Sequence, residues 1–205
     1  MTSNTTSILV REHELILKVL DALEGFASMI ERADPVYPQD ARAFVEFFRE
    51  FTDACHHGKE EDILFAAMVD AGFPSESGPL GVMRGEHGRG RRLVRRLRDL
   101  AERVVEWTDE DRESFAGAAH AFAELLREHI RKEDEVLYPM AEAHLSAEQL
   151  RRVGELFRLF EEQRTGPGAH ERLHKLAHEL IERYALLAPS ESTLGMKRVP
   201  SCCGL

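Results

Sequence analysis

The stretch His56-His57-Gly58-Lys59-Glu60-Glu61-Asp62-Ile63-Leu64-Phe65 is matched in pattern by His129-Ile130-Arg131-Lys132-Glu133-Asp134-Glu135-Val136-Leu137-Tyr138. In each stretch a histidine precedes a glutamate by four residues, which is about one helical turn, so both side chains project from the same helix face. An imidazole and a carboxylate placed in this way can bind one metal ion together. Two such pairs of ligands on facing helices could hold a pair of ions.

The rest of the chain predicts an all-α fold, because no stretch alternates apolar and polar residues as strands do. Proline and glycine clusters separate the helices that we expect, at about 6–32, 40–69, 80–107, 108–143, 146–163 and 169–187. The first four are long and joined by short loops, which indicates an up-down-up-down four-helix bundle. We expect a metal-binding bundle at 6–143, two additional C-terminal helices packed on it at 146–187, and a flexible tail at 188–205.

Composition narrows the class of protein. The net charge of −10 argues against a nucleic-acid partner. No apolar run approaches the roughly 20 residues of a membrane helix, and the start does not look like a secretory signal, so we expect no membrane association. Three cysteines, Cys55, Cys202 and Cys203, form no disulfide framework and favour a reducing cytoplasm. Cys202 and Cys203 are either an ordinary C-terminus or a redox or soft-metal pair.

Histidines also occur in apolar stripes of the first and third helices. His13 lies among Leu9, Leu17 and Leu20, and His87 lies among Met83, Val94 and Leu97. His56, Glu60, His129 and Glu133 fall on apolar stripes as well, whereas His57 and Glu61 fall on a more polar flank. We therefore expect every bundle helix to present an inward histidine, and burial of these polar groups requires a partner such as a metal pair.

The ligand count fits two ions. His13, His56, His87 and His129 would supply four bonds, and Glu60 and Glu133 would bridge the ions, together with an oxo or hydroxo group. About two positions of two octahedral ions would then stay open for a small molecule, and this ligand set suits iron, or alternatively manganese or zinc. A lone inward histidine is commonly just a core residue, so the prediction rests on the joint arrangement. Ferritin-like bundles use Glu-x-x-His, the reverse order.

At these residues the chain resembles the hemerythrin family in its bacterial form, with a hemerythrin (HHE) cation-binding domain. His13, His56-x-x-x-Glu60, His87 and His129-x-x-x-Glu133 match the ligand order of that family over residues 8 to about 143. The resemblance implies a four-helix bundle with a non-heme di-iron centre that meets O2, peroxide or nitric oxide.

One residue departs from the family pattern. Oxygen-carrying hemerythrins have a further histidine one turn after the position of His87, where this chain has Arg91. The resemblance leaves His57 and Glu86 as candidates to replace that ligand. An open site favours redox chemistry or sensing over reversible O2 transport.

We expect a di-iron protein that binds or reduces O2, peroxide or nitric oxide in an oxidative or iron response; the alternative is an O2 or iron sensor or store without turnover. The third predicted helix is rich in arginine, with Arg84, Arg89, Arg91, Arg92, Arg95, Arg96, Arg98 and Arg103. These are either a solvated face or a docking surface for an acidic protein partner. His170, His174 and His178 are expected on a partly exposed amphipathic edge, the alternative being a surface metal site.

Overall fold

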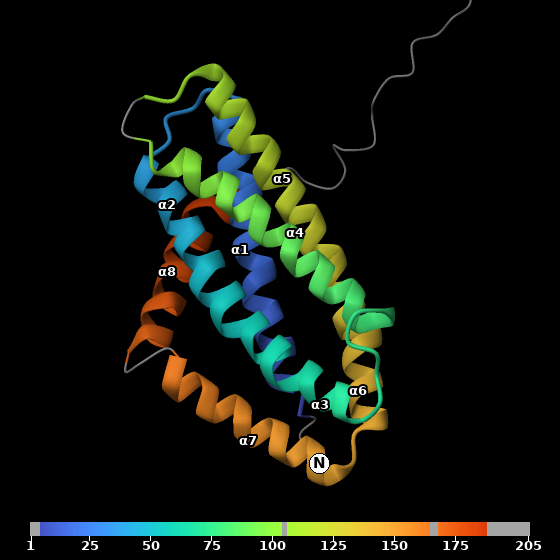
Figure 1. Ribbon diagram of the computed structural model, residues 1–205. Coiled ribbons are helices and arrows are strands. Elements are labelled where there is room, and N and C mark those ends of the chain that lie inside the picture. The colour runs from blue at the N-terminus through green and yellow to red at the C-terminus, as the bar shows by residue number, and fades with distance from the viewer. Residues whose placement is uncertain (1–4, 104–105, 165–167, 188–205) are drawn as a thin grey trace, which may run out of the picture.

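The computed structural model describes residues 5–103, 106–164 and 168–187 (Figure 1). Every regular element among them is a helix, so the prediction of an all-α chain is confirmed there. The α-helices are α1 (Ser7–Glu31), α2 (Pro38–Phe47), α3 (Phe65–Asp70), α4 (Gly78–Ala101), α5 (Asp109–Lys132), α6 (Tyr138–His144), α7 (Ala147–Arg164) and α8 (Ala169–Tyr184). The predicted tail at 188–205, with Cys202 and Cys203, lies outside the described residues.

The second and fourth predicted helices are interrupted by turns of wider π-helix. These are η1 (Phe48–His57) and η2 (Glu60–Leu64), which separate α2 from α3, and η3 (Glu133–Leu137), which separates α5 from α6. A π-helix bonds residue i to i+5 and is most often found at functional sites. A fourth short element, η4 (Ala185–Leu187), is a 3-10 turn after α8.

Several helix ends follow from side chains that the sequence already contains. Thr108 and Asp111 form a capping box at the start of α5. Ser146 and Gln149 form the same motif before α7. The third predicted helix, in contrast, ends at Ala101 and not at Trp107. The Trp107 indole donates a hydrogen bond to the Leu100 carbonyl at 3.1 Å, near that helix end.

The long helices lie side by side along most of the molecule (Figure 1). Neighbouring elements are α1 with α5, α5 with α4, and α4 with α2. Helix α8 lies against α1 and α2, and α7 crosses one end of the molecule in contact with η2. None of the described helices combines the length and the apolar character needed to cross a lipid bilayer.

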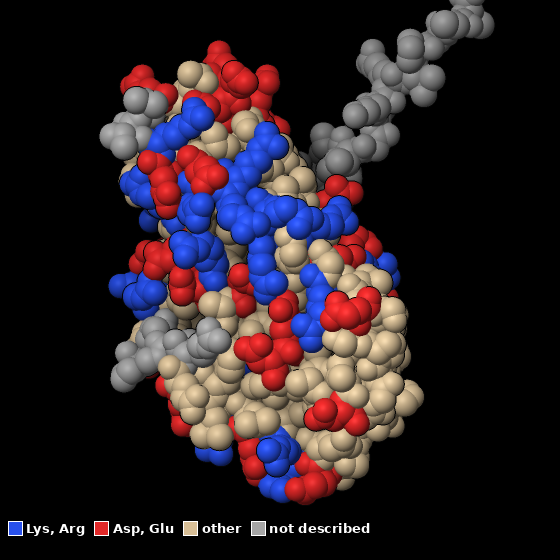
Figure 2. All heavy atoms as spheres, viewed as in Figure 1, with Lys and Arg blue, Asp and Glu red and all other residues tan. Residues whose placement is uncertain are grey.

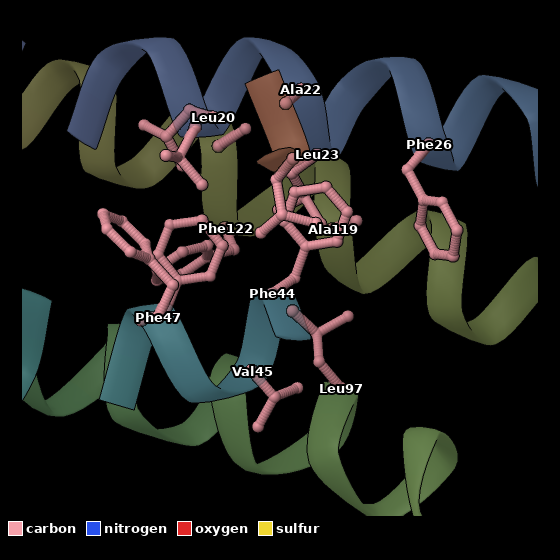
Figure 3. Close-up of a cluster of buried hydrophobic side chains, with 14 of the residues drawn as sticks. Leu20, Ala22, Leu23, Phe26, Phe44, Val45, Phe47, Leu97, Ala119 and Phe122 are labelled. Carbon is pink, nitrogen blue, oxygen red and sulfur yellow. The ribbon is translucent and has the colours of Figure 1, made fainter. Parts of the chain in front are cut away.

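The apolar core is divided into two clusters. The larger one joins α1, α2, α4, α5 and α8, and includes Leu23, Phe44, Leu97 and Phe122 (Figure 3). The smaller one joins the start of α1, η2 with α3, the start of α4, η3 with α6, and α7, and it includes Leu9, Phe65 and Phe157.

A buried polar layer separates the two clusters. Along α1, His13 lies between Leu9 of the smaller cluster and Ile16 of the larger one. Glu133 likewise lies between Ile130 of the larger cluster and Leu137 of the smaller one. The apolar residues above and below therefore fix the height at which the polar side chains enter the interior.

Replacing Phe44 by alanine tests the larger cluster. Phe44 is fully buried, and its ring centroid lies 5.4 Å from that of Phe26 and 5.9 Å from that of Tyr184. Phe44→Ala should lower the free energy of unfolding by about 3–5 kcal/mol in urea titrations at fixed metal content. Val82→Ala, at a side chain that is 49% exposed, is the control. Equal stability of the two variants would show that Phe44 is not part of a packed core.

Candidate metal centre

The six predicted ligands converge in the polar layer. His13 (α1), His56 (η1), Glu60 (η2), His87 (α4), His129 (α5) and Glu133 (η3) are all buried, with at most 1% of each residue exposed. The Nε2 atoms of His13 and His56 lie 2.9 Å apart, and those of His87 and His129 lie 3.0 Å apart. Glu133 lies between the two pairs, 3.3 Å from His13 Nε2 and 3.1 Å from His129 Nε2.

Two groups of side chains could each hold a cation. One consists of His13, His56, Glu60 and Glu133, and the other of His57, Glu60, His87 and His129. The ligand atoms within each group lie within 4.8 Å of one another, and Glu60 belongs to both. The described residues contain no third group of this kind. His170, His174 and His178 on α8 belong to neither of the two.

His57 is buried, and this corrects its predicted position on the helix flank. Only 5% of the residue is exposed, and its ring stacks on that of His87 with centroids 3.9 Å apart. In η1 the wider π-turn changes which residues share a face, because i and i+5 replace i and i+4 as neighbours. His56 and His57 can therefore both face the polar layer, which an ordinary α-helix would not allow as readily.

The outer nitrogen of each imidazole is held by a carboxylate. Nδ1 of each ring lies 2.5–3.3 Å from a carboxylate oxygen, in the pairs His13–Asp134, His56–Glu12, His57–Asp53, His87–Glu61 and His129–Glu86. Because an ionised carboxylate only accepts hydrogen bonds, Nδ1 donates, and Nε2 is the ring nitrogen that faces the layer and can bind a cation once its proton is lost. Carboxylates placed in this way fix the orientation of a metal-binding histidine and raise its basicity.

Glu86, a candidate replacement ligand from the sequence, lies outside both ligand groups. Its carboxylate lies on the outer side of His129 and also pairs with Lys132, and it is in neither ligand group. Arg91, at the position of the missing family histidine, pairs instead with Asp53 at 2.8 Å and Glu61 at 2.9 Å. Arg91 thus connects the carboxylates that hold His57 and His87.

Sequence reasoning assigned none of these carboxylates the role of holding a histidine, although a signal exists for four of them. Each is next in sequence to a proposed ligand of one helix and hydrogen-bonds a ligand of another. Glu12 follows this rule beside His13, Glu61 beside Glu60, Glu86 beside His87 and Asp134 beside Glu133. The layer is therefore cross-linked between helices by residues that a stripe pattern assigns to the flank.

Tyr138 is a further polar group that the sequence pattern did not single out. Its hydroxyl donates a hydrogen bond to Glu60 Oε1 at 2.6 Å and lies 3.3 Å from His13 Nε2. Tyr138 follows Glu133 by five residues, as Phe65 follows Glu60, which is the spacing of one π-turn. Tyr138 stacks on His13 at 5.5 Å and Phe65 on His87 at 6.0 Å, so the two stretches place equivalent rings on two histidines.

The electrostatics of the layer favour cations. Burial alone would raise the pKa of Glu133, but the imidazoles of His129 and His13, at 3.1 and 3.3 Å from its oxygens, lower it well below its ordinary value. Burial favours the neutral form of His13, yet its hydrogen bond to Asp134 and the nearby carboxylate of Glu133 raise its pKa to about 10. Burial, and then the charge of His87, lower the pKa of His57 to about 3. The His57 imidazole is therefore neutral at pH 7, which is the form that binds metal ions.

The residues present also fit a metal by their unmet hydrogen-bonding capacity. Glu60 Oε2, both carboxylate oxygens of Glu133 and Nε2 of His57 are buried without a hydrogen-bond partner. Orphaned polar atoms of this kind are costly in a protein interior. Nitrogen and oxygen atoms that face one another across about 3 Å suit divalent cations as ligands, because a bound cation replaces the protons that such atoms would otherwise carry.

Comparison with known proteins agrees with this geometry. The family model described as the hemerythrin HHE cation binding domain matches residues 4–141. "Uncharacterized protein Rv1995" of Mycobacterium tuberculosis (strain H37Rv) and "Uncharacterized protein Mb2018" of Mycobacterium bovis are each 27% identical over 160 residues. That match covers 77% of this chain and 61% of each relative, so the chain spans less than two thirds of their length. No solved structure matches.

The outer carboxylates can be tested with two adjacent residues. Asp134→Ala removes the partner of His13 Nδ1, so it should weaken Fe²⁺ binding about 10- to 100-fold. Glu135→Ala is the control, since Glu135 is 60% exposed and pairs with Arg131 on the surface. Affinity is measured without oxygen by competition with a colorimetric chelator. Equal affinities for the two variants would mean that Asp134 does not support the centre.

Proposed function

Because this chain belongs to the hemerythrin HHE cation-binding domain family, we propose that it holds two iron ions in the polar layer and binds or reduces O2, peroxide or nitric oxide there. The observation that carries this proposal is the pair of buried ligand groups that share Glu60. His13 and His56 would bind one ion, and His57, His87 and His129 the other. Glu60 and Glu133 would bridge the two.

His57 would then take the place of the histidine that Arg91 replaces. Five imidazoles, two bridging carboxylates and an oxo or hydroxo bridge leave about one position of two octahedral ions open. This is one fewer than four histidines would leave, and it suits a single small molecule. Iron fits the mixture of imidazole and carboxylate ligands, while manganese and zinc are the alternatives that metal analysis would reveal.

An iron pair, when bound, supplies electrons for the reduction of O2 or peroxide. The protein contributes the surroundings of that chemistry. The apolar clusters on both sides limit water, the outer carboxylates orient the imidazoles, and the Tyr138 hydroxyl oxygen lies 2.6 Å from Glu60 Oε1, to which it donates its proton in a hydrogen bond. The phenol can orient Glu60 through this bond, or it can turn and donate the same proton to a molecule bound beside it.

We also propose that the four long stretches form an up-down-up-down bundle around the centre, within a unit at 6–143. The neighbour relations of α1, α5, α4 and α2, and the entry of one ligand-bearing stretch from each, support this arrangement. The segment at 146–187 would be an extension packed on that unit, as the contacts of α7 with η2 and of α8 with α1 suggest.

A sensor is the second candidate, because one contact links the centre to α7. Lys59 is fully buried and pairs with both Glu12 and Glu161. Glu12 in turn accepts a hydrogen bond from His56, so a change in the position of His56 would reach α7 through three side chains. A sensor needs an output of this kind, whereas an enzyme does not.

Metal content tests the centre itself. Protein purified from iron-fed cells should contain about two iron ions per chain, and less than one would contradict the proposal. His56→Ala, His57→Ala and Glu133→Ala should each lower the iron content strongly. His120→Ala should not, because His120 is partly exposed and pairs with Glu31 on the surface. Equal iron in all four variants would refute the ligand assignment.

Peroxide turnover separates the two candidate functions. The iron-loaded enzyme should consume many equivalents of hydrogen peroxide per chain in steady state, which is followed by the fall in peroxide absorbance. A sensor should show one oxidation in its optical spectrum and then stop. Loaded protein that changes neither its spectrum nor the peroxide concentration would exclude both, while leaving metal binding intact.

A further inference from the structure

A pocket of about 220 Å³ lies between η1 and α4, directly beside the polar layer. His57 lines it, so a molecule in the pocket would be one side chain away from the candidate metal centre. Pockets for drug-sized ligands enclose roughly 300–1,000 Å³, so this one suits a molecule of only a few heavy atoms. Phe48, Val94 and Phe122 supply apolar walls.

The charged residues of the pocket are mostly arginines. Arg91 and Arg98 have their own partners, since Arg91 pairs with Asp53 and Glu61, and Arg98 pairs with Asp99. Arg49 and Arg95 also line the pocket, and no ion pair joins either of them to another described residue. Two guanidinium groups without a carboxylate partner thus border a small cavity.

The one acidic residue of the pocket does not cancel this charge. Asp53 accepts hydrogen bonds from Arg91 at 2.8 Å and from His57 at 3.3 Å, which commits its carboxylate to those two groups. Figure 2 shows Lys and Arg side chains gathered over the face that α4 presents, although the whole chain has a net charge of −10. A local positive field of this kind concentrates anions at a cleft even on an acidic protein.

Thr52, one of the residues that line the pocket, carries a buried hydroxyl without a partner among the described residues. Thr52 is 1% exposed, and its Oγ1 atom forms no hydrogen bond with any described residue. An unmet donor in the interior is unfavourable unless a ligand or water accepts its hydrogen bond. The apolar walls would strengthen such a bond, because charge–dipole interactions are stronger where water is excluded.

We propose that this pocket binds a small oxygen-bearing monoanion, whose oxygens accept hydrogen bonds from Arg49, Arg95 and Thr52. A guanidinium presents two N–H groups in a plane that matches two oxygens of one acceptor, so carboxylates and inorganic oxyanions share the required chemistry. The site uses no residue of the two ligand groups as its anion donor. It can therefore be tested separately from iron binding.

Sodium acetate is the probe, and acetamide is its neutral match in shape. Calorimetric titration of the purified protein, with metal content measured and ionic strength fixed, should give saturable binding of acetate at one site per chain and none of acetamide. Equal binding of the two would overturn the proposal, because recognition would then not depend on charge. Absence of saturable acetate binding would overturn it as well.

Variants locate the site. The double variant Arg49→Gln/Arg95→Gln should weaken acetate binding at least about tenfold, and Thr52→Val should weaken it about threefold. Arg89→Gln is the control, because Arg89 is an exposed arginine of α4 that lines a different hollow. Unchanged affinity in the double variant would place acetate elsewhere, for example on the metal itself. Thermal melting and iron content should stay at the wild-type values in all three.

Competition distinguishes the two sources of the anion. Butyrate that displaces acetate more strongly than nitrate does would assign the pocket to carboxylic acids, whose hydrocarbon contacts the wall of Phe48, Val94 and Phe122. Stronger displacement by nitrate would assign it to inorganic oxyanions. Displacement by neither would contradict the proposed pocket.

Discussion

The fold depends on one constraint, the burial of five imidazoles and two carboxylates in a layer between two apolar clusters. Such a layer is stable only if its charges and hydrogen bonds are balanced, because water cannot reach it. The imidazoles lower the pKa of Glu133, and the acids in turn raise the pKa values of His13 and His87, so the layer retains positive charge as protons or as metal ions. The helices that carry these groups must therefore pack closely enough for the charges of the layer to pair with one another.

The outer carboxylates and the π-turns are two responses to that constraint. A carboxylate on Nδ1 leaves Nε2 facing the interior. In four of the five pairs the carboxylate comes from another helix, so it also fixes how neighbouring helices are rotated. The π-turns at Glu60 and Glu133 bring Phe65 and Tyr138 onto the same face as these acids. One of those rings carries a hydroxyl, and so the two halves of the centre differ in their supply of protons.

Much of the architecture could be predicted from sequence, because helix periodicity and capping are local. The capping boxes at Thr108 and Ser146, and the inward positions of His13 and His87, follow from spacing alone. What failed depended on non-local packing. The position of His57 required the π-turn, and the early end of α4 required the contact of Trp107 with Leu100. The first changes the number of residues per helical turn and the second concerns where a helix ends. A sequence pattern that assumes a fixed helical spacing predicts neither.

Lys59 connects α7 to the buried polar layer. Its ammonium group is fully buried, and one of its two acidic partners, Glu161, comes from α7. Gly58, the preceding residue, leaves room for the Phe160 ring, which a Cβ atom would approach to 2.7 Å. A chain shortened to end before α7 would strand a cation beside the acid that orients His56. Loss of α7 would avoid this cost only if residue 59 changed at the same time, so a substitution at one of these two places constrains the other.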